Sequence, residues 1–292
     1  MMTLDRRTFI GTMGAALLAV RHVAAASIRR FGAQLYTVRT ELEKDFDGTL
    51  AKVAAAGYTE VEFAGYFNHT PQQVRDALKR HRLTAPSAHI DYGSLTGDKW
   101  VRVIESARTI GHQYLVNAWV DASIRDQPGA WERIAETYNR AAEASRKAGI
   151  QFAYHNHNFE FAPRKDADGK LPYDILLGAC DARLVKMELD LCWIAAAGKD
   201  PLEYFRRYPG RFPMVHVKGL RKLPPATGEA VPIDRVLPDI TDVGHDDVID
   251  WKRVFAQARA AGIRHYFVEH DVPKQPIESL KASHDYLARL RF

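Results

Sequence analysis

Short apolar runs alternate with longer amphipathic segments from residue 27 onward. The longer segments repeat apolar residues at helical spacing, and several glycines stand where helices are expected to end. Eight strand–helix units in about 260 residues favour a closed barrel of parallel strands over an open sheet. We therefore predict one α/β domain, a single (β/α)8 TIM barrel over residues 27–292. The predicted strands are Phe31–Tyr36, Glu60–Ala64, Ala85–Ile90, Tyr114–Ala118, Gln151–His157, Val185–Leu191, Phe212–Val217 and Tyr266–Glu269.

Polar side chains stand near the end of nearly every predicted strand, at the face where the active sites of such barrels lie. A single polar residue there often only caps the next helix. A carboxylate or an imidazole on so many strands indicates a functional site instead. In chain order the candidates are Gln34, Tyr36, Glu62, His89, Asn117, His155, His157, Glu188, Asp190, His216, Lys218 and Glu269.

The stretch Tyr154–Phe161 contains three side chains close together that could bind a metal or move a proton. Alternate side chains of a strand share a face, so His155 and His157 are expected to point the same way, with Glu160 close behind. Two imidazoles on one face are costly to bury without partners. The stretch therefore indicates either a hydrogen-bonded structural pair or one wall of a metal or acid–base site.

Histidine and carboxylate ligands together suit zinc, manganese, iron or cobalt, and a divalent transition metal is the predicted cofactor. Such an ion would polarise a carbonyl group and stabilise an enediolate while side chains move a proton. The predicted ligands are His155, Asp190, His216 and Glu269, with Glu188 as an alternative; His157 and Glu160 are further candidates on strand five.

The remaining candidates are assigned to catalysis or to substrate binding. The expected substrate is a small carbohydrate, whose carbonyl group or vicinal diol the metal would polarise. Trp119 and Trp193 offer flat faces on which a sugar could stack, although packing beneath the loops explains both equally well. The predicted catalytic residues are Glu269, His157, Glu160 and Lys218. The predicted substrate-binding residues are Gln34, Tyr36, Glu62, His89, Asn117 and Trp193.

The first 26 residues differ in character from the rest. Arg6 and Arg7 precede a short apolar run, Ala15–Val20, and the small residues Ala24–Ala26. This order predicts a twin-arginine signal peptide that is cleaved after Ala26 and a periplasmic protein. An uncleaved anchor or an amphipathic helix is the alternative. The apolar run is too short to span a membrane, and no span is expected in the mature chain.

The net charge and the two cysteines give no sign of a nucleic-acid-binding surface or of a cysteine metal site. The net charge of +5 falls to +3 without the predicted leader, which is too weak to indicate nucleic-acid binding. Cys180 and Cys192 lack the spacing of a metal site, and two separate buried thiols are expected, although pairing stays open. A homo-oligomer is possible.

Several of these motifs resemble the sugar phosphate isomerase/epimerase family with the xylose-isomerase-like TIM barrel. They are Gln34–Arg39, Tyr154–Phe161, Glu188–Trp193, His216–Lys218, Val243–His245 and Ile249–Trp251. The resemblance implies a metal held by Glu, Asp, His and Glu from strands five to eight. Asp190, His216 and Glu269 match the last three positions, and His155 stands where the epimerases have the first Glu.

That departure leaves the reaction open. In the epimerases, the strand-five Glu is also an acid–base group, so its loss removes half of a proton shuttle. The histidine-rich strand is similar to relatives that act on keto-inositols or keto-glycosides, where proton removal leads to elimination. An isomerase or epimerase is predicted first, and a lyase second. A non-catalytic sugar-binding barrel is a further alternative, whereas the weak charge and the leader argue against the related AP endonucleases.

The segment from Gly219 to Asp250 is long, proline-rich and charged, with Pro224 and Pro225 near its start. Loops of this length without secondary structure are usually functional or mobile. The segment follows strand seven, so it is expected to be either a lid that carries Arg221, Lys222 or His245 over the site, or a surface excursion toward a neighbouring subunit.

Overall fold

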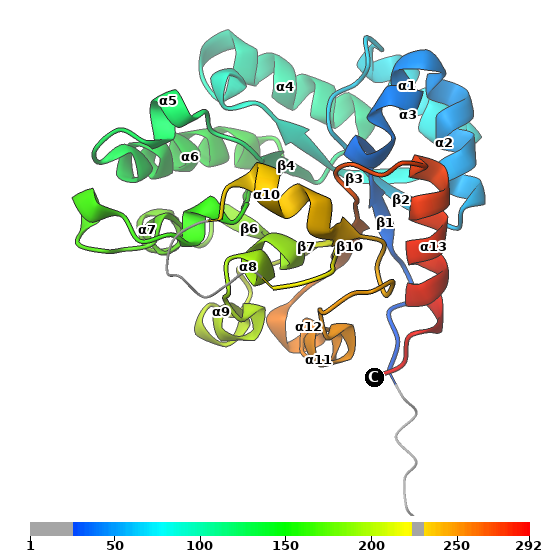
Figure 1. Ribbon diagram of the computed structural model, residues 1–292. Helices are drawn as coiled ribbons and strands as arrows, with labels where there is room; N and C mark the ends of the chain where they lie inside the picture. Colours follow the sequence, from blue (N-terminus) through cyan, green and yellow to red (C-terminus); the bar gives the residue numbers. More distant parts are fainter. Residues whose placement is uncertain (1–25, 224–230) are drawn as a thin grey trace, which may run out of the picture.

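Eight parallel strands close into a barrel in the computed structural model, in the order β1-β10-β7-β6-β5-β4-β3-β2 (Figure 1). The predicted (β/α)8 barrel is confirmed. The structure describes residues 26–223 and 231–292. The predicted leader up to residue 25 and the Pro224–Pro225 pair lie outside the described residues.

Each predicted strand is present within a few residues of its expected bounds. The barrel strands are β1 Gly32–Gln34, β2 Glu60–Phe63, β3 Thr84–Ile90, β4 Tyr114–Asn117, β5 Gln151–His155, β6 Val185–Asp190, β7 Met214–Val217 and β10 His265–Val268. A separate antiparallel pair consists of β8 Gly219–Leu220 and β9 Ile240–Thr241.

The helices surround the barrel, as Figure 1 shows. They are α1 Arg39–Lys44, α2 Phe46–Ala55, α3 Pro71–Arg80, α4 Gly97–Ile110, α5 Ala122–Arg125, α6 Ala130–Lys147, α7 Pro172–Ala179, α8 Leu191–Ala196, α9 Pro201–Arg207, α10 Ile233–Val236, α11 Trp251–Ala256, α12 Ala258–Ala261 and α13 Pro276–Arg289. Short 3-10 helices are Leu35–Val38, Tyr92–Ser94, Phe159–Phe161, Lys165–Ala167 and Leu237–Asp239.

Two strands end earlier than their apolar runs suggest, because a polar side chain turns the backbone. Gln34 closes β1 when its side-chain oxygen accepts a hydrogen bond from the Tyr36 N–H at 3.0 Å. After His155 the chain leaves β5 and enters the 3-10 helix Phe159–Phe161, with the side chain of Glu160 accepting from the His157 N–H at 2.9 Å. Both turns place polar residues at the same end of the barrel.

A small apolar cluster lies apart from the main core, which packs between the strands and the helices. The members of the small cluster come from the inward-facing positions of β4, β5, β7 and β10: Tyr114, Val116, Ala153, Met214 and Phe267. Gly32 leaves room for this cluster, since a Cβ atom there would lie 2.5 Å from the Phe267 ring. We expect this cluster to form the floor beneath the polar strand ends.

The segment that follows β7 is not a bare loop. Its described parts form the pair β8–β9, the helix α10 and a 3-10 helix, and α10 lies across the barrel in Figure 1. Of the predicted lid residues, Arg221 and His245 line a different groove, and Lys222 pairs with Asp239 at 3.1 Å. The segment covers the barrel with apolar side chains instead, as described below.

The two ends of the described chain meet. The backbone N–H of Ala26 donates to the carbonyl of Phe292 at 2.7 Å, and the N–H of Phe292 donates back at 3.1 Å. Phe292 also lies against Phe255 of α11, with ring centroids 6.0 Å apart. Since Ala26 precedes β1, this junction belongs to the side of the barrel where the strands begin.

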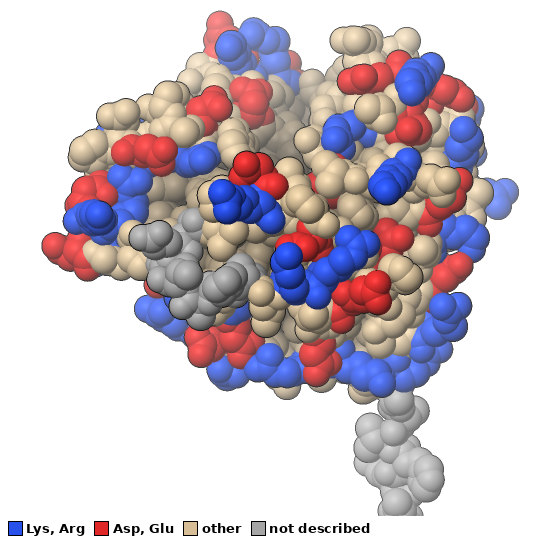
Figure 2. All heavy atoms as spheres, viewed as in Figure 1, with Lys and Arg blue, Asp and Glu red and all other residues tan. Residues whose placement is uncertain are grey.

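The two thiols are separate and buried, as the sequence predicts. Basic and acidic side chains are interspersed over the face shown in Figure 2. Cys180 and Cys192 are both buried and unpaired. Within the two described ranges, the helices are too short or too polar to cross a bilayer.

His112, a buried residue outside the group of polar strand ends, makes the stability of the fold depend on pH. Its Nδ1 lies 2.6 Å from the Ala85 carbonyl, so it donates there, and its Nε2 accepts from the Tyr66 hydroxyl at 3.1 Å. Burial lowers the pKa of His112 to about 4. The pKa is about 6.5 in an unfolded chain, so the unfolded state takes up the extra proton first, and stability falls as the pH drops from 6.5 toward 4.

Replacing His112 with glutamine is expected to remove this contribution. Between pH 7 and pH 4.5 the wild-type free energy of unfolding should fall by about 2–3 kcal/mol more than that of His112→Gln. Urea unfolding at both pH values measures the difference. Equal pH dependence in the two proteins would contradict the assignment.

Candidate metal and active site

A cavity of about 430 Å³ opens at the ends of the barrel strands, between the strand-end side chains and the loops. Its volume falls within the range of small-molecule sites, about 300–1,000 Å³. The lining residues are Tyr36, His89, Ala118, Trp119, His155, His157, Trp193, Lys218, Ile233, Leu237, Glu269, Asp271 and Val272. Seven of the predicted site residues are among them, and they come from strands on all sides of the barrel.

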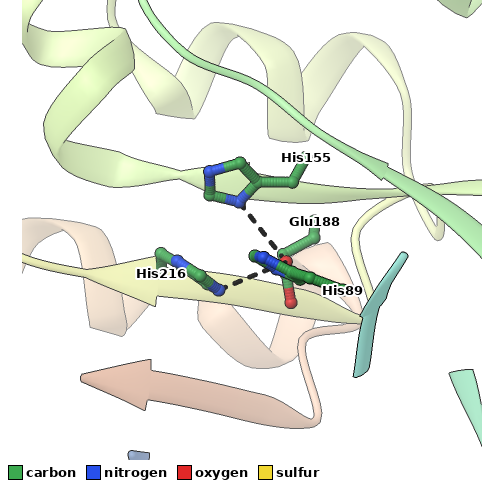
Figure 3. Close-up of side chains that lie close together, drawn as sticks. All are labelled: His89, His155, Glu188 and His216. Carbon is green, nitrogen blue, oxygen red and sulfur yellow. Dashed lines mark hydrogen bonds and ion pairs between the residues drawn. The ribbon is translucent and has the colours of Figure 1, made fainter. Parts of the chain in front are cut away.

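Three imidazoles converge on one carboxylate in the histidine group, which consists of His89, His155, Glu188 and His216 (Figure 3). Oε2 of Glu188 lies 2.9 Å from Nε2 of His89, 3.2 Å from Nε2 of His216 and 3.3 Å from Nδ1 of His155. One ligand atom from each of the four residues lies within 4.8 Å of the others. The strand register explains the grouping, because His155 pairs directly with Glu188 across β5 and β6.

Glu62 and Gln34 adjoin the histidine group from β2 and β1. Oε1 of Glu62 lies 2.8 Å from Nε2 of His216 and 3.0 Å from Nε2 of His89, and it accepts from the Gln34 amide at 2.6 Å. Burial alone would lower the pKa of His89, but the charges of Glu62 and Glu188 outweigh it and raise that pKa to about 9. Gln34 and Glu62 therefore act on the histidines, and neither of them lines the cavity.

A buried ammonium group lies among three carboxylates in the lysine group, which consists of Lys218, Asp190, Glu269 and Asp271. Nζ of Lys218 lies 2.9 Å from Oε2 of Glu269 and 3.1 Å from Oδ2 of both aspartates. Lys218 is only 1% exposed. Burial opposes its charge, but the three carboxylates outweigh burial and hold the pKa of Lys218 well above its usual value.

His216 belongs to the edge of both groups. Its Nε2 faces Glu62 and Glu188, while its Nδ1 lies 2.7 Å from Oε2 of Glu269 and 3.8 Å from Oδ2 of Asp190. Asp190, His216 and Glu269 form a second set of ligand atoms within 4.8 Å of one another. The register again accounts for the contact, because Asp190 pairs with His216 across β6 and β7.

The four predicted metal ligands are therefore divided between two neighbouring sets. His155 belongs to the histidine group, together with the alternative ligand Glu188. Asp190 and Glu269 belong to the second set, and His216 is the one residue common to both sets. His155 and Asp190 still approach each other, with Nε2 and Oδ2 3.9 Å apart. His89, which was predicted to bind substrate, is one of the four residues of the histidine group, which could hold a metal ion.

His157 and Glu160 have separate places. The His157 ring lines the cavity 5.2 Å from the ring of His155, as their shared strand face predicts. Burial lowers the pKa of His157 well below its usual value, and the nearby Lys218 adds to the effect. Glu160 is fully buried outside the cavity, where its carboxylate binds the Tyr154 hydroxyl and the His157 N–H. It holds the turn that carries His157.

The other predicted substrate-binding residues also differ in position. Tyr36 and Trp193 line the cavity, and Tyr36 is 41% exposed at its rim. Asn117 does not reach the cavity: its amide donates to the carbonyls of Ile90 and Trp119, and its oxygen accepts from Tyr138 at 2.6 Å. Asn117 therefore connects the ends of β3 and β4.

Several lining residues were not among the predicted site residues. Asp271 pairs with Lys218, and its place two residues after Glu269 is the one signal that could have indicated it. Trp119, suggested by the sequence only as a face for stacking, stands 41% exposed at the rim, with the Arg125 guanidinium 4.7 Å from its ring centroid. Ile233 and Leu237 come from the segment after β7 and form an apolar wall. Nothing in their local sequence marked them.

The donor set fits a divalent transition metal. Buried atoms at the centre lack hydrogen-bond partners among the described residues, notably Nδ1 of His155, Oε1 of Glu188 and Oε2 of Glu62. Unpaired buried polar groups are costly, and a cation would satisfy them. Imidazole and carboxylate donors in one set are typical of zinc, iron, cobalt and manganese sites.

Comparison with known proteins identifies the family of this fold. Residues 50–290 match the family model described as xylose isomerase-like TIM barrel. A protein named inosose dehydratase from Lacticaseibacillus casei is 24% identical over 205 residues, which is 62% of this chain and 65% of that protein. The chain thus spans just under two thirds of the length of that relative.

Two solved structures are similar in fold. A sugar phosphate isomerase/epimerase from Parabacteroides distasonis has a TM-score of 0.74 and 23% identity, with 90% of this chain and 99% of that chain covered. A protein described as IOLI with a bound zinc atom has a TM-score of 0.65 and 14% identity, with 89% and 98% covered. With its closed barrel and with a family match over most of its length, the chain belongs to the xylose isomerase-like TIM barrel family.

Proposed function

We propose that this protein is an isomerase or epimerase that moves a proton at the carbon next to the carbonyl group of a sugar or keto-sugar. The observation that supports it best is the placement of two proton-transfer groups around one cavity. Glu269 follows β10 and His157 follows β5, and β6 and β7 separate these strands in the barrel. A substrate in the cavity can therefore contact both groups at once.

The protonation states suit this division of roles. Burial opposes the charge on Glu269, but Lys218 and His216 hold the pKa of that carboxyl well below its usual value, so it is ionised and can accept a proton from carbon. His157 is neutral, since its pKa is lowered. A neutral imidazole has one nitrogen that accepts and one that donates, so it can move a proton at the adjacent oxygen.

The remaining residues would bind and orient the substrate. Trp119, Trp193 and Tyr36 line the cavity, and aromatic side chains of this kind offer apolar surface to a sugar ring. Lys218 keeps a positive charge at the cavity wall that offsets negative charge developing on the carbonyl oxygen. A divalent metal, held by the histidine group or by Asp190, His216 and Glu269, would polarise the same carbonyl.

A dehydratase is the second candidate function, favoured by the relative named inosose dehydratase. The first step would be the same: Glu269 removes the proton next to the carbonyl. A hydroxyl group on the following carbon would then leave as water, with its proton supplied by the protein. The two reactions therefore differ in the fate of the intermediate and share the same initial residues.

Proton exchange in heavy water tests both candidates. The purified protein is loaded with Zn²⁺, Mn²⁺ or Co²⁺ and incubated with ketoses, keto-glycosides and inososes, and the products are followed by NMR. Deuterium at the carbon next to the carbonyl, together with an isomer or epimer, supports the first candidate. Loss of water supports the second. Sugar binding without any exchange would contradict both and would indicate a binding protein.

A further inference from the structure

We infer that the metal of this chain binds to the histidine group, and that Lys218 fills the cation position among the carboxylates of Asp190, Glu269 and Asp271. Ligands from strands five to eight would instead place the metal in the set Asp190, His216 and Glu269. The inference rests on the proposed function only in taking the chain to bind a divalent metal. Its test measures binding alone, without a substrate.

The spacing of the histidine group suits direct coordination. With metal–ligand distances of about 2.0–2.1 Å, the corners of a tetrahedral site are about 3.3 Å apart. The three imidazole nitrogens lie 2.9, 3.2 and 3.3 Å from Oε2 of Glu188. Figure 3 shows the three rings directed at this carboxylate from three strands. The four ligand atoms all lie within 4.8 Å of one another, so the nitrogens that are farthest apart would move closer together when all four bind one ion.

In two of the histidines, the ring nitrogen that points away from Glu188 faces another carboxylate, as in the histidine ligands of many metal sites. The contact of 2.7 Å between Nδ1 of His216 and Glu269 lets Nδ1 donate, and it leaves Nε2 to bind on the side of Glu188. On His155, Nδ1 faces Glu188 while Nε2 lies 3.9 Å from Asp190. Glu269 and Asp190 thus occupy the positions of partners that orient ligands.

The carboxylates of the lysine group already share a cation. Nζ of Lys218 has an oxygen of Asp190, Glu269 and Asp271 within 2.9–3.1 Å. Oδ1 of Asp190 is also engaged, because it accepts from the N–H groups of Cys192 and Trp193 at the start of α8. A metal ion at this place would meet a buried ammonium group at close range, where like charges repel strongly.

The histidine group, by comparison, has buried polar atoms with neither a hydrogen-bond partner nor a lysine nearby in the described part of the chain. Nδ1 of His155, Oε1 of Glu188 and Oε2 of Glu62 are all buried without hydrogen-bond partners among the described residues. Oδ2 of Asp190 and Oδ2 of Asp271 also lack hydrogen bonds there, but each lies 3.1 Å from the ammonium group of Lys218. The competing explanation is a metal-free network in which protonated His89 and His216 neutralise Glu62 and Glu188. That network leaves the three atoms unpaired, whereas an ion at the centre would contact His155 and Glu188 directly.

Two isosteric substitutions on one strand distinguish the positions. Glu188 and Asp190 lie two residues apart on the same face of β6, and both are fully buried. Each protein is stripped with a chelator and titrated with Zn²⁺ and with Co²⁺. Metal content after dialysis and the visible absorption of bound Co²⁺ are measured. Circular dichroism checks the fold, and His89→Gln serves as a second variant if Glu188→Gln does not fold.

The wild-type protein is expected to bind one metal ion per chain. Glu188→Gln and His89→Gln should weaken binding by about 100-fold or more, because each loses a direct ligand. Asp190→Asn, which keeps the helix cap, should weaken it by no more than the roughly 10–100-fold typical of an orienting partner and should keep the Co²⁺ spectrum. Tight binding in Glu188→Gln with loss in Asp190→Asn would overturn the inference, as would a wild-type protein without metal. Normal binding without sugar turnover would contradict only the proposed function.

Discussion

Replacing Glu269 with glutamine is expected to lower kcat/KM for the proton-transfer reaction by about 10²–10⁴-fold, the usual effect of losing a general base. The amide cannot accept a proton from carbon. It can still occupy the same place at the cavity wall and accept from the Lys218 ammonium group, now 2.9 Å from Oε2 of Glu269. The loss should therefore appear in kcat more than in KM.

Deuterium uptake and steady-state kinetics on the same metal-loaded protein measure this effect. Glu278→Gln is a suitable control, since it makes the same chemical change at an exposed position in the first turn of α13. The control should stay close to the wild type. A Glu269→Gln protein that exchanges substrate protons at the wild-type rate would show that another residue is the base.

Replacing Lys218 with methionine is expected to lower the free energy of unfolding by about 3–5 kcal/mol, the range found when one partner of a buried ion pair is removed. Methionine is similar in length but carries no charge. Asp190, Glu269 and Asp271 would be left facing one another without their shared counter-ion. The effect should weaken toward acid pH, beginning with Asp271, whose pKa burial already raises to about 6.

Urea unfolding of metal-free protein at pH 7.5 and at pH 5 tests this expectation. Lys222→Met is the matched control, because Lys222 pairs with Asp239 while its side chain stays 73% exposed. An exposed pair contributes about 0–1 kcal/mol, so the control should lose little. Equal losses in the two variants would mean that the lysine group adds no more to stability than a surface contact.

The fold could be predicted because its signal repeats. Each strand is a short apolar run between amphipathic helices, and the same period occurs eight times, so errors of one or two residues at strand ends do not change the architecture. The errors that occurred have local causes. Gln34 and Glu160 bind backbone N–H groups with their side chains and turn the chain before the apolar run has ended.

The members of the site were harder to predict than its position. The alternation of side chains along each strand shows which of them point into the barrel. Which residues of neighbouring strands lie side by side depends instead on the register between the strands. The register places His155 beside Glu188 and Asp190 beside His216. A shift of two residues between β5 and β6 would preserve every inward face and would pair His155 with Asp190 instead. A single sequence does not contain that information.

Long-range contacts were the other missing part. Glu160 was expected to be catalytic because of its place in Tyr154–Phe161, yet the Tyr154 hydroxyl draws it beneath the turn. Ile233 and Leu237 reach the cavity only because the segment after β7 folds back across the barrel. Neither outcome follows from local sequence, since both depend on how distant segments pack.

The meeting of Ala26 and Phe292 makes the described chain nearly circular. A short flexible linker could join these two positions on the side where the strands begin, away from the cavity. The ring could then be opened at Gly169, which is exposed and has a φ of +76° in the loop before α7. Breaks are tolerated best at exposed loop tips of this kind. Such a permuted protein would begin and end in the loop that joins β5 to α7, which would allow a fusion partner or a spectroscopic label to be attached on the side of the barrel where the strands end, without altering any strand.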